Sequence, residues 1–185
     1  MSSVQAGRHE MVMSELAGDE SVAPESFKTA FRNHPLGVAV VTAAPDDEMV
    51  AMTVSSLSSV SAEPPLLLFS ASAVSSSTPV LDRASTVVVH MLGADQIGLA
   101  KLGAKSGVDR FADPSSWRRL PTGEPVYLDV EAWLRGTVVH RLGVGGSVVY
   151  IVHVIEAWSS DAPPSDPLVY HNRTWHRLGA ESAIA

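Results

Sequence analysis

Cysteine is absent from the 185 residues of this chain. Its absence excludes disulfide bonds, catalysis by a thiolate, and zinc or iron–sulfur centres held by cysteine. Long hydrophobic runs are also missing, since no stretch approaches the roughly 18 apolar residues that span a bilayer. The N-terminus has no basic segment followed by an apolar block, so we expect no signal peptide and a cytoplasmic protein without a membrane partner.

Positive charge is scarce. The chain has 13 basic and 20 acidic residues, which gives a formal net charge of -7. Binding to nucleic acid requires a basic face that neutralises phosphates. The composition therefore argues against nucleic acid as a partner.

The common catalytic signatures are missing too. The sequence contains no GxxxxGK[ST], GxSxG or HExxH, the patterns of phosphate-binding loops, serine hydrolases and zinc peptidases. The segment GVGG (Gly143–Gly146) differs from a dinucleotide fingerprint, because Val148 stands where the third glycine belongs and a strand follows. No two histidines from His34 onward lie at helical i, i+4 spacing, and we expect no metal site.

What the chain does contain is the composition of one globular domain, with 45% hydrophobic and 18% charged residues. Residues 1–23 carry scattered glycines and acids without periodicity, which predicts a disordered leader. The folded domain is expected over residues 24–178, and residues 179–185 are expected to form a short tail.

Strand patterns dominate the expected domain. A short helix is predicted where Phe27, Ala30 and Phe31 share one face, and Pro35 ends it at His34. Three β-rich runs follow and predict an antiparallel meander whose middle strand is Val50–Ser61. The other expected elements are strands at Gly37–Ala43, Leu66–Ala71, Thr86–Leu92, Val126–Leu142 and Ser147–Trp158, a closing β segment at Pro167–Leu178, a helix that starts at Ser77 or Thr78, and a helix at Ala94–Ala104. Gly143–Gly146 is expected to form a hairpin connection.

Strands follow strands here rather than alternating regularly with helices. The predicted fold class is therefore mainly β or α+β, an antiparallel barrel with short helices on its rim.

Hydroxyl groups crowd the predicted middle strand, at Thr53, Ser55, Ser56, Ser58, Ser59 and Ser61. Hydroxyls and free backbone amides at the end of a buried strand suit a ligand edge rich in acceptors, followed by a phosphate. A second hydroxyl cluster, Val74–Leu81, stands at a predicted helix start, which favours an anion. Lys101, Lys105 and Arg110 are nearby in sequence. Together these features predict a site for a large planar heterocycle that carries a phosphate.

Six segments in a fixed order resemble the flavin reductase-like family, whose fold is the FMN-binding split barrel. The segments are GVAVVTA, MTVSSLSSVSAEPPLLLFS, SSSTPVL, ADQIGLAKLG, DRF and PLVYHNRTW. The resemblance covers about residues 26–178. It implies a homodimeric split β-barrel that binds FMN or FAD, takes NADH or NADPH as co-substrate, and often supplies a flavin-dependent monooxygenase.

The resemblance also implies a set of site residues. The family's isoalloxazine segment matches Thr53, Val54, Ser55, Ser56 and Leu57, its phosphate segment matches Ser76, Ser77 and Thr78, and Lys101, Leu102, Gly103, Arg110 and Phe111 complete the flavin site. On the nicotinamide side the matching residues are Ser147, Tyr170, His171, Arg173 and Trp175. Hydride transfer between two stacked rings needs no covalent catalyst, so no catalytic residue is predicted.

One departure from the family pattern affects the nicotinamide side. Reductases of the family usually show Gly-Asp-His before the last long strand, whereas this chain has Gly145, Gly146 and Ser147. His90 also stands where the family often has asparagine, and Trp175 where tyrosine is common. The leading hypothesis is an NAD(P)H:flavin oxidoreductase. The alternatives are a flavin-binding carrier or sensor that has lost nicotinamide turnover, a flavin- or deazaflavin-dependent oxidoreductase acting on another small molecule, and a module that binds no flavin.

Several residues also have a purely structural interpretation. Ser58 and Ser61 fit turn caps, and Trp133 and Trp158 fit packing positions on barrel strands. Phe111 fits the core as well as a flavin wall, and Arg110 fits a surface charge as well as the site.

Overall fold

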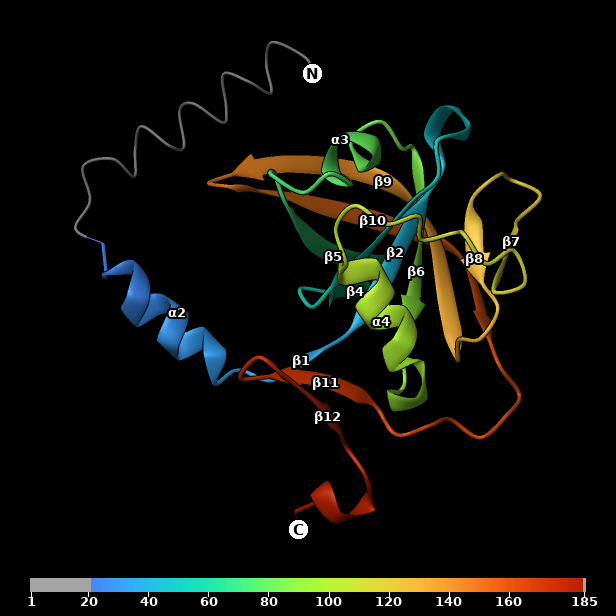
Figure 1. Ribbon diagram of the computed structural model, residues 1–185. Coiled ribbons are helices and arrows are strands. Elements are labelled where there is room, and N and C mark those ends of the chain that lie inside the picture. The colour runs from blue at the N-terminus through green and yellow to red at the C-terminus, as the bar shows by residue number, and fades with distance from the viewer. Residues whose placement is uncertain (1–20, 185) are drawn as a thin grey trace.

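The computed structural model describes residues 21–184, and its main feature is a seven-stranded antiparallel sheet in the order β3-β2-β6-β9-β10-β5-β4 (Figure 1). Its strands are β2 (Ala39–Ala43), β3 (Val50–Val54), β4 (Ser58–Ala62), β5 (Pro65–Ser72), β6 (Thr86–Met91), β9 (Ala132–Val144) and β10 (Ser147–Ser159). The sheet curves around one apolar core and forms a barrel. The predicted fold class, a mainly β antiparallel barrel with short rim helices, is confirmed.

Two smaller sheets and several short helices surround the barrel. The smaller sheets are β1 (Leu36–Gly37), β11 (Leu168–His171) and β12 (Thr174–Arg177), in the order β1-β11-β12, and the pair β7 (Trp117–Arg119) and β8 (Pro125–Tyr127). The helices are α2 (Pro24–Arg32), α3 (Thr78–Leu81) and α4 (Ile97–Ala104), with 3-10 turns at Pro45–Asp47, Ala94–Gln96 and Ala180–Ser182. Except for residues 21–23, the predicted leader lies outside the described residues.

The prediction of one strand over Val50–Ser61 is wrong. The chain leaves the sheet after Val54 and re-enters it at Ser58, so β3 and β4 form opposite edges of the seven-stranded sheet. Residues 55–57, which we call the crossing segment, connect the two edges and close the barrel. The run is therefore not the middle of a meander. The sequence could not distinguish one long strand from two short strands on opposite edges, because the run contains no glycine or proline that would mark the break.

The predicted hairpin between the two longest strands is confirmed. Val144 pairs with Ser147, which leaves Gly145 and Gly146 as a two-residue turn. Gly145 has a φ of 57°, a conformation that a glycine adopts without steric strain. The turn places the start of β10 beside the end of β5, because Ser147 pairs with Ser72.

The barrel interior is a single apolar cluster. Phe69 and Tyr150, both fully buried, stack at its centre with ring centroids 4.9 Å apart. The Tyr150 hydroxyl donates to Asp82 Oδ1 at 2.7 Å, which satisfies the polar end of an otherwise buried ring. Alternate residues of the same strands, including Leu68 and Ile151, belong to neither buried cluster of the described chain and face outward.

A second buried cluster fills the space between the barrel wall and α4 with the segment around β8. His90 is fully buried within this region. Its Nδ1 lies 3.0 Å from the Val40 carbonyl oxygen, and its Nε2 accepts from the Tyr127 amide at 3.1 Å. An imidazole that accepts at Nε2 carries its proton on Nδ1, so His90 is neutral and joins β6 to β2 and β8. Burial lowers its pKa to about 4, against an opposing effect of the Val40 hydrogen bond.

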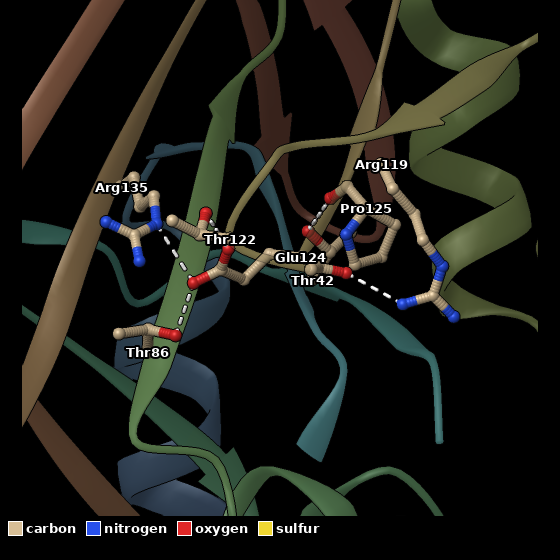
Figure 2. A network of polar contacts seen from close by, with 8 residues as sticks. Thr42, Thr86, Arg119, Thr122, Glu124, Pro125 and Arg135 are labelled. Carbon is tan, nitrogen blue, oxygen red and sulfur yellow. Dashed lines mark hydrogen bonds and ion pairs between the residues drawn. The ribbon is translucent and has the colours of Figure 1, made fainter. Parts of the chain in front are cut away.

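A buried ion pair fixes the β7–β8 segment to the barrel (Figure 2). Arg135 Nε donates to Glu124 Oε1 at 2.9 Å, and Thr86 and Thr122 donate their hydroxyl protons to the same carboxylate. Burial raises the pKa of Glu124, but the hydrogen bonds from Thr122 and Thr86 and the charge of Arg135 outweigh it and leave the pKa below its usual value. The carboxylate is thus a satisfied structural anion.

Helix α2, in contrast to the buried ion pair, is exposed. No residue of α2 is buried, and Figure 1 shows it projecting away from the barrel beside the β1–β11–β12 sheet. Phe27 and Phe31 are each 55% exposed, although their rings contact each other at a centroid distance of 4.6 Å. The helix is anchored at its end, where the Asn172 amide donates to the Arg32 carbonyl at 3.0 Å.

Candidate functional site

A pocket of about 480 Å³ opens where β3, β5 and α4 end. We call it the hydroxyl pocket, because serines dominate its lining. The lining residues are Met52, Thr53, Val54, Ser55, Ser56, Ser70, Ala71, Ser72, Val74, Ser75, Ser76, Ser77, Gly103, Ala104, Ser106 and Arg110. Within this lining Arg110 is the sole charged side chain. The volume and the mixture of apolar and polar groups are typical of a cofactor site.

Close packing of α4 on β3 forms one wall of the hydroxyl pocket. The Thr53 hydroxyl donates to the Ala100 carbonyl at 2.7 Å. A Cβ at Gly103 would collide with the Thr53 side chain and would lie 3.1 Å from its backbone nitrogen. Glycine at this position therefore lets the end of α4 lie directly on the strand, and a side chain there would move the helix.

Many of the hydroxyls that crowd the sequence serve the fold. The Thr53 and Ser77 side chains bond to backbone carbonyls of Ala100 and Ala51, at 2.7 and 3.4 Å. Ser56 bonds to the backbone of Ser70. Among residues 21–184, other serines of the lining have side-chain oxygens with no hydrogen-bond partner, and these are Ser55, Ser70, Ser72, Ser76 and Ser106. These five hydroxyls are the groups that a ligand can engage.

Arg110 gives the hydroxyl pocket an anion-binding group. Its Nη2 donates to the Lys105 carbonyl at 2.8 Å, which orients the guanidinium. Its Nε is buried and has no hydrogen-bond partner in the described chain. The guanidinium as a whole brings one positive charge to the pocket lining, which favours an anionic ligand there.

Five of the predicted flavin-side residues do not line the hydroxyl pocket. Leu57 packs against the barrel core, and the buried Thr78 hydroxyl donates to the Ser72 carbonyl at 2.7 Å. Phe111 is a core residue, stacked on Tyr127 with centroids 5.8 Å apart. The other two, on α4, are Lys101, which is exposed, and Leu102, which is partly buried. The remaining eight predicted residues line the pocket together.

Sequence reasoning missed several lining residues. Ser70 and Ser72 are outward-facing positions of β5, and Ser106 lies in the loop after α4. Ser75, in the loop after β5, belongs to the hydroxyl cluster Val74–Leu81 that the sequence did indicate. One signal was present: Ser70 and Ser72 are polar residues at the end of a strand that begins as the apolar run LLLF.

A second pocket, of about 420 Å³, lies between α2 and the β11–β12 turn and meets the hydroxyl pocket at Ser55, which lines both. We call it the cationic pocket. Its lining residues are Phe27, Lys28, Phe31, Arg32, His34, Leu36, Ser55, Tyr170, Asn172 and Arg173. Three basic side chains and no carboxylate line it, in a chain whose net charge is -7.

The predicted nicotinamide-side residues are divided by the fold. Tyr170 and Arg173 line the cationic pocket. Trp175 packs on Tyr170 with ring centroids 4.8 Å apart, and His171 lies against His176. Ser147 lines neither pocket, although it pairs with Ser72 of the hydroxyl pocket.

The two linings suit ligand binding rather than attack on a substrate. Neither contains a carboxylate, and each offers cationic groups beside apolar surface. Over residues 21–184 no cluster of three or more histidine, aspartate or glutamate side chains could hold a metal ion, and no helix there is long and apolar enough to cross a bilayer. The arrangement can hold two neighbouring ligands, each with a negatively charged part.

Comparison with known proteins gives a consistent result. The family model described as "Flavin reductase like domain" matches residues 31–179. An NADH:FMN oxidoreductase of Rhodococcus qingshengii is 40% identical over 153 residues, which cover 82% of this chain and 80% of that protein. The reductase component of a 4-nitrophenol monooxygenase from Rhodococcus opacus is 28% identical, over 86% of this chain and 88% of its own.

Solved structures share the fold. A flavin reductase domain protein from Arthrobacter sp. FB24 superposes with a TM-score of 0.80 at 32% identity, covering 85% of this chain and 96% of that chain. An NADH:FAD oxidoreductase of Streptomyces globisporus C-1027, solved with NAD and FAD fragments, superposes with a TM-score of 0.77 at 26% identity, covering 89% of this chain and 100% of that chain.

Proposed function

The chain belongs to the flavin reductase-like family, and on this premise we propose that the hydroxyl pocket holds the flavin and the cationic pocket receives the nicotinamide donor. The protein is an NAD(P)H-dependent flavin reductase that uses FMN or FAD. The observation that carries the assignment of the pockets is their shared residue, Ser55, because hydride transfer requires the two ligands to touch.

The residues of the hydroxyl pocket fit a flavin. The positive charge of Arg110 in the pocket lining suits a phosphate. The unbonded hydroxyls of Ser55, Ser70 and Ser72 suit the nitrogen and oxygen atoms at the edge of the ring system. Ser76 lies in the loop before α3 and offers a further hydroxyl to the phosphate.

Hydride transfer from a dihydronicotinamide C4 to the flavin N5 is chemistry that the two bound heterocycles supply. The part left to this chain is to hold them in contact and to exclude water. Donor groups of the crossing segment, directed at the ring edge, would stabilise negative charge that develops there, as an oxyanion hole does. Hydride transfer of this kind needs no side chain of either pocket as an acid or a nucleophile.

Anaerobic stopped-flow absorbance tests this function. Protein loaded with FMN or FAD is mixed with excess NADH or NADPH, and we expect rapid loss of the oxidised flavin band with at least one donor. A flavin that stays bound and oxidised with both donors would instead favour the carrier hypothesis, for which Gly146 and Ser147 are the motivation.

We also propose a homodimer, built on the outward face of β5, β9 and β10. Leu66, Leu68, Leu142, Val149 and Ile151 lie on this face, and we call it the outer apolar face. Leu142 is 40% exposed, and the nearby Ile155 is 50% exposed. Ser70 pairs with Val149, so a second copy seated on this face would also border the hydroxyl pocket.

A flavin-dependent monooxygenase is the partner we propose for the reduced flavin, by analogy with the Rhodococcus opacus reductase component. Oxidation of an aromatic substrate by a separately purified monooxygenase, driven by this protein with NADH and FMN or FAD, would test it. Omission of this protein is the control.

A further inference from the structure

Arg173 has an unusual backbone conformation. His171 pairs with Thr174, so Asn172 and Arg173 form the two-residue turn between β11 and β12. Their φ angles are 47° and 62°, values that define a type I′ turn, in which the second position is typically glycine. An arginine in the left-handed region is less stable than a glycine there, because its Cβ crowds the backbone. The fold therefore contains an arginine where a glycine would be more stable.

The side chain of Arg173 is available to a ligand. It lines the cationic pocket, and neither it nor the Arg32 side chain has a hydrogen bond or ion pair within residues 21–184. The two arginines lie on segments that are joined, since the Asn172 amide donates to the Arg32 carbonyl at 3.0 Å. Lys28, the third cation, is paired with Glu25 at 2.7 Å. The pocket thus presents two uncompensated guanidinium groups.

Charge and shape together define the occupant. Two guanidiniums match a group with two negative charges, and guanidinium forms paired hydrogen bonds with phosphate oxygens. Phe27 and Phe31 add an exposed aromatic surface on the same pocket wall, on which a flat base can stack. Ser55 lines both pockets, so a ligand bound to the arginines at one end must reach the hydroxyl pocket with its other end to donate a hydride there.

We propose that α2 and the β11–β12 turn bind the adenosine diphosphate part of the nicotinamide dinucleotide, with Arg32 and Arg173 on its pyrophosphate and the Phe27–Phe31 pair against its adenine. This inference deepens the proposed function and rests on it. The strained turn persists because it directs a cation into the pocket, and the exposed face of α2 is a ligand surface.

Titration calorimetry with ADP-ribose, on the full chain, tests the proposal without any redox reaction. The variants are Arg173→Gly and Arg32→Gln, and the matched control is Arg118→Gln, an exposed arginine of β7 that lines neither pocket. We expect each pocket variant to weaken ADP-ribose binding about 10-fold. R173G should also melt at the same temperature as the parent or higher, because glycine relieves the turn.

Kinetics supply the second readout. Because the pyrophosphate contacts are the same before and during hydride transfer, R173G and R32Q should raise the KM for NADH while kcat at saturation stays unchanged. The proposal is overturned if both variants bind ADP-ribose within twofold of the parent affinity. It is also overturned if the parent does not bind ADP-ribose at millimolar concentration. A shift of R32Q or R173G from dimer to monomer with unchanged ADP-ribose affinity also overturns it and assigns the pocket to a second copy.

The two proposals fail in different ways. If the protein reduces flavin with NADH but the variants bind ADP-ribose as the parent does, the proposed function holds and this inference is wrong. If the variants weaken ADP-ribose binding but the protein does not reduce flavin, the binding site is supported and the proposed function is wrong.

Discussion

The hydroxyl of Ser56 donates to the carbonyl oxygen of Ser70 at 3.0 Å and accepts from the amide of the same residue at 2.8 Å. A strand partner makes the same two bonds in an antiparallel ladder. The Ser56 side chain thus replaces a backbone partner at the point where the sheet leaves a gap, and it closes the barrel beside the hydroxyl pocket.

Ser56→Ala should open this closure. It leaves the Ser70 amide and carbonyl without their partner, and we expect a loss of about 1–3 kcal/mol in the free energy of unfolding, measured by chemical denaturation. Flavin affinity should fall as well, because Ser55 and Ser70 lose their fixed spacing. Ser58→Ala is the control, since that exposed hydroxyl bonds to the neighbouring Ser59 carbonyl. Equal stability of the two variants would contradict the role of Ser56.

Gly103→Ala should separate α4 from β3. The added methyl meets the Thr53 side chain and lies 3.1 Å from the Thr53 nitrogen, so we expect a destabilisation of about 1–3 kcal/mol and weaker flavin retention in fluorescence titrations. Gly98→Ala, in the same helix with open space around its Cα, is the control. That variant should be neutral or more stable by up to about 1 kcal/mol. A stable G103A with normal flavin affinity would argue against close packing at this wall.

Stability should fall between pH 7 and pH 5 because of His90. Its pKa is about 4 in the fold against 6.5 in an unfolded chain, so the unfolded state binds the proton first. The contribution is complete above pH 6.5 and is lost as the pH falls toward 4, which amounts to about 2 kcal/mol between pH 7 and pH 5. Denaturation at both values measures it.

The control for this pH effect is His90→Asn, which removes the titrating group and should flatten the dependence in this window. Glu124, whose pKa is lowered, contributes stability above its unfolded value of 4.5 and loses it at lower pH. The stabilising contributions of His90 and Glu124 are therefore lost in different pH ranges. A parent curve that is flat from pH 7 to pH 5 would contradict a neutral, buried His90.

Ile151→Glu should prevent dimer formation. Ile151 lies at the centre of the outer apolar face, paired with Leu68 and His140, and a carboxylate there would be buried by a second copy without a partner. We expect the dimer dissociation constant to rise on the order of 100-fold or more, measured by light scattering after gel filtration. Ile184→Glu, at a residue 97% exposed near the C-terminus, is the control. An unchanged dimer in I151E would place the interface elsewhere.

Glu25→Gln should shift donor preference toward NADPH. The variant breaks the exposed pair with Lys28 and returns a third cation to the cationic pocket, where the extra phosphate of NADPH can use it. Because exposed ion pairs are weak, the ratio of kcat/KM for NADPH over NADH should rise only about two- to fivefold. Glu181→Gln is a control outside both pockets. A ratio equal to that of the parent would mean that Lys28 does not face the donor.

The sequence allowed prediction of the features that depend on local patterns. The β9–β10 hairpin followed from two adjacent glycines between β-rich runs. The hydroxyl-bearing end of β3 and the start of the crossing segment followed from Thr53, Ser55 and Ser56. The break at the crossing segment could not be predicted, because no glycine or proline in Val50–Ser61 marks it. Thr78 and Phe111 show the same limit, since whether a hydroxyl or a ring faces a pocket or the fold depends on packing.

The cationic pocket was harder still to foresee. Arg32 and Arg173 stand near opposite ends of the sequence and meet only because β1 pairs with β11. The closing segment PLVYHNRTW indicated Arg173 as a site residue, but nothing in the sequence indicated that Arg173 lies beside α2. Conversely, the turn that holds Arg173 is recognisable from its φ angles and not from its residues, because Asn-Arg is not a usual type I′ sequence.

Ser55 belongs to both pockets. In the proposed assignment Ser55 borders both ligands, so it is the place where the binding of one can affect the binding of the other. Any factor by which the dinucleotide changes the flavin affinity must equal the factor by which the flavin changes the dinucleotide affinity. Substitution of Ser55 alters this coupling constant together with both individual affinities, so only a full cycle of binding measurements can separate the three.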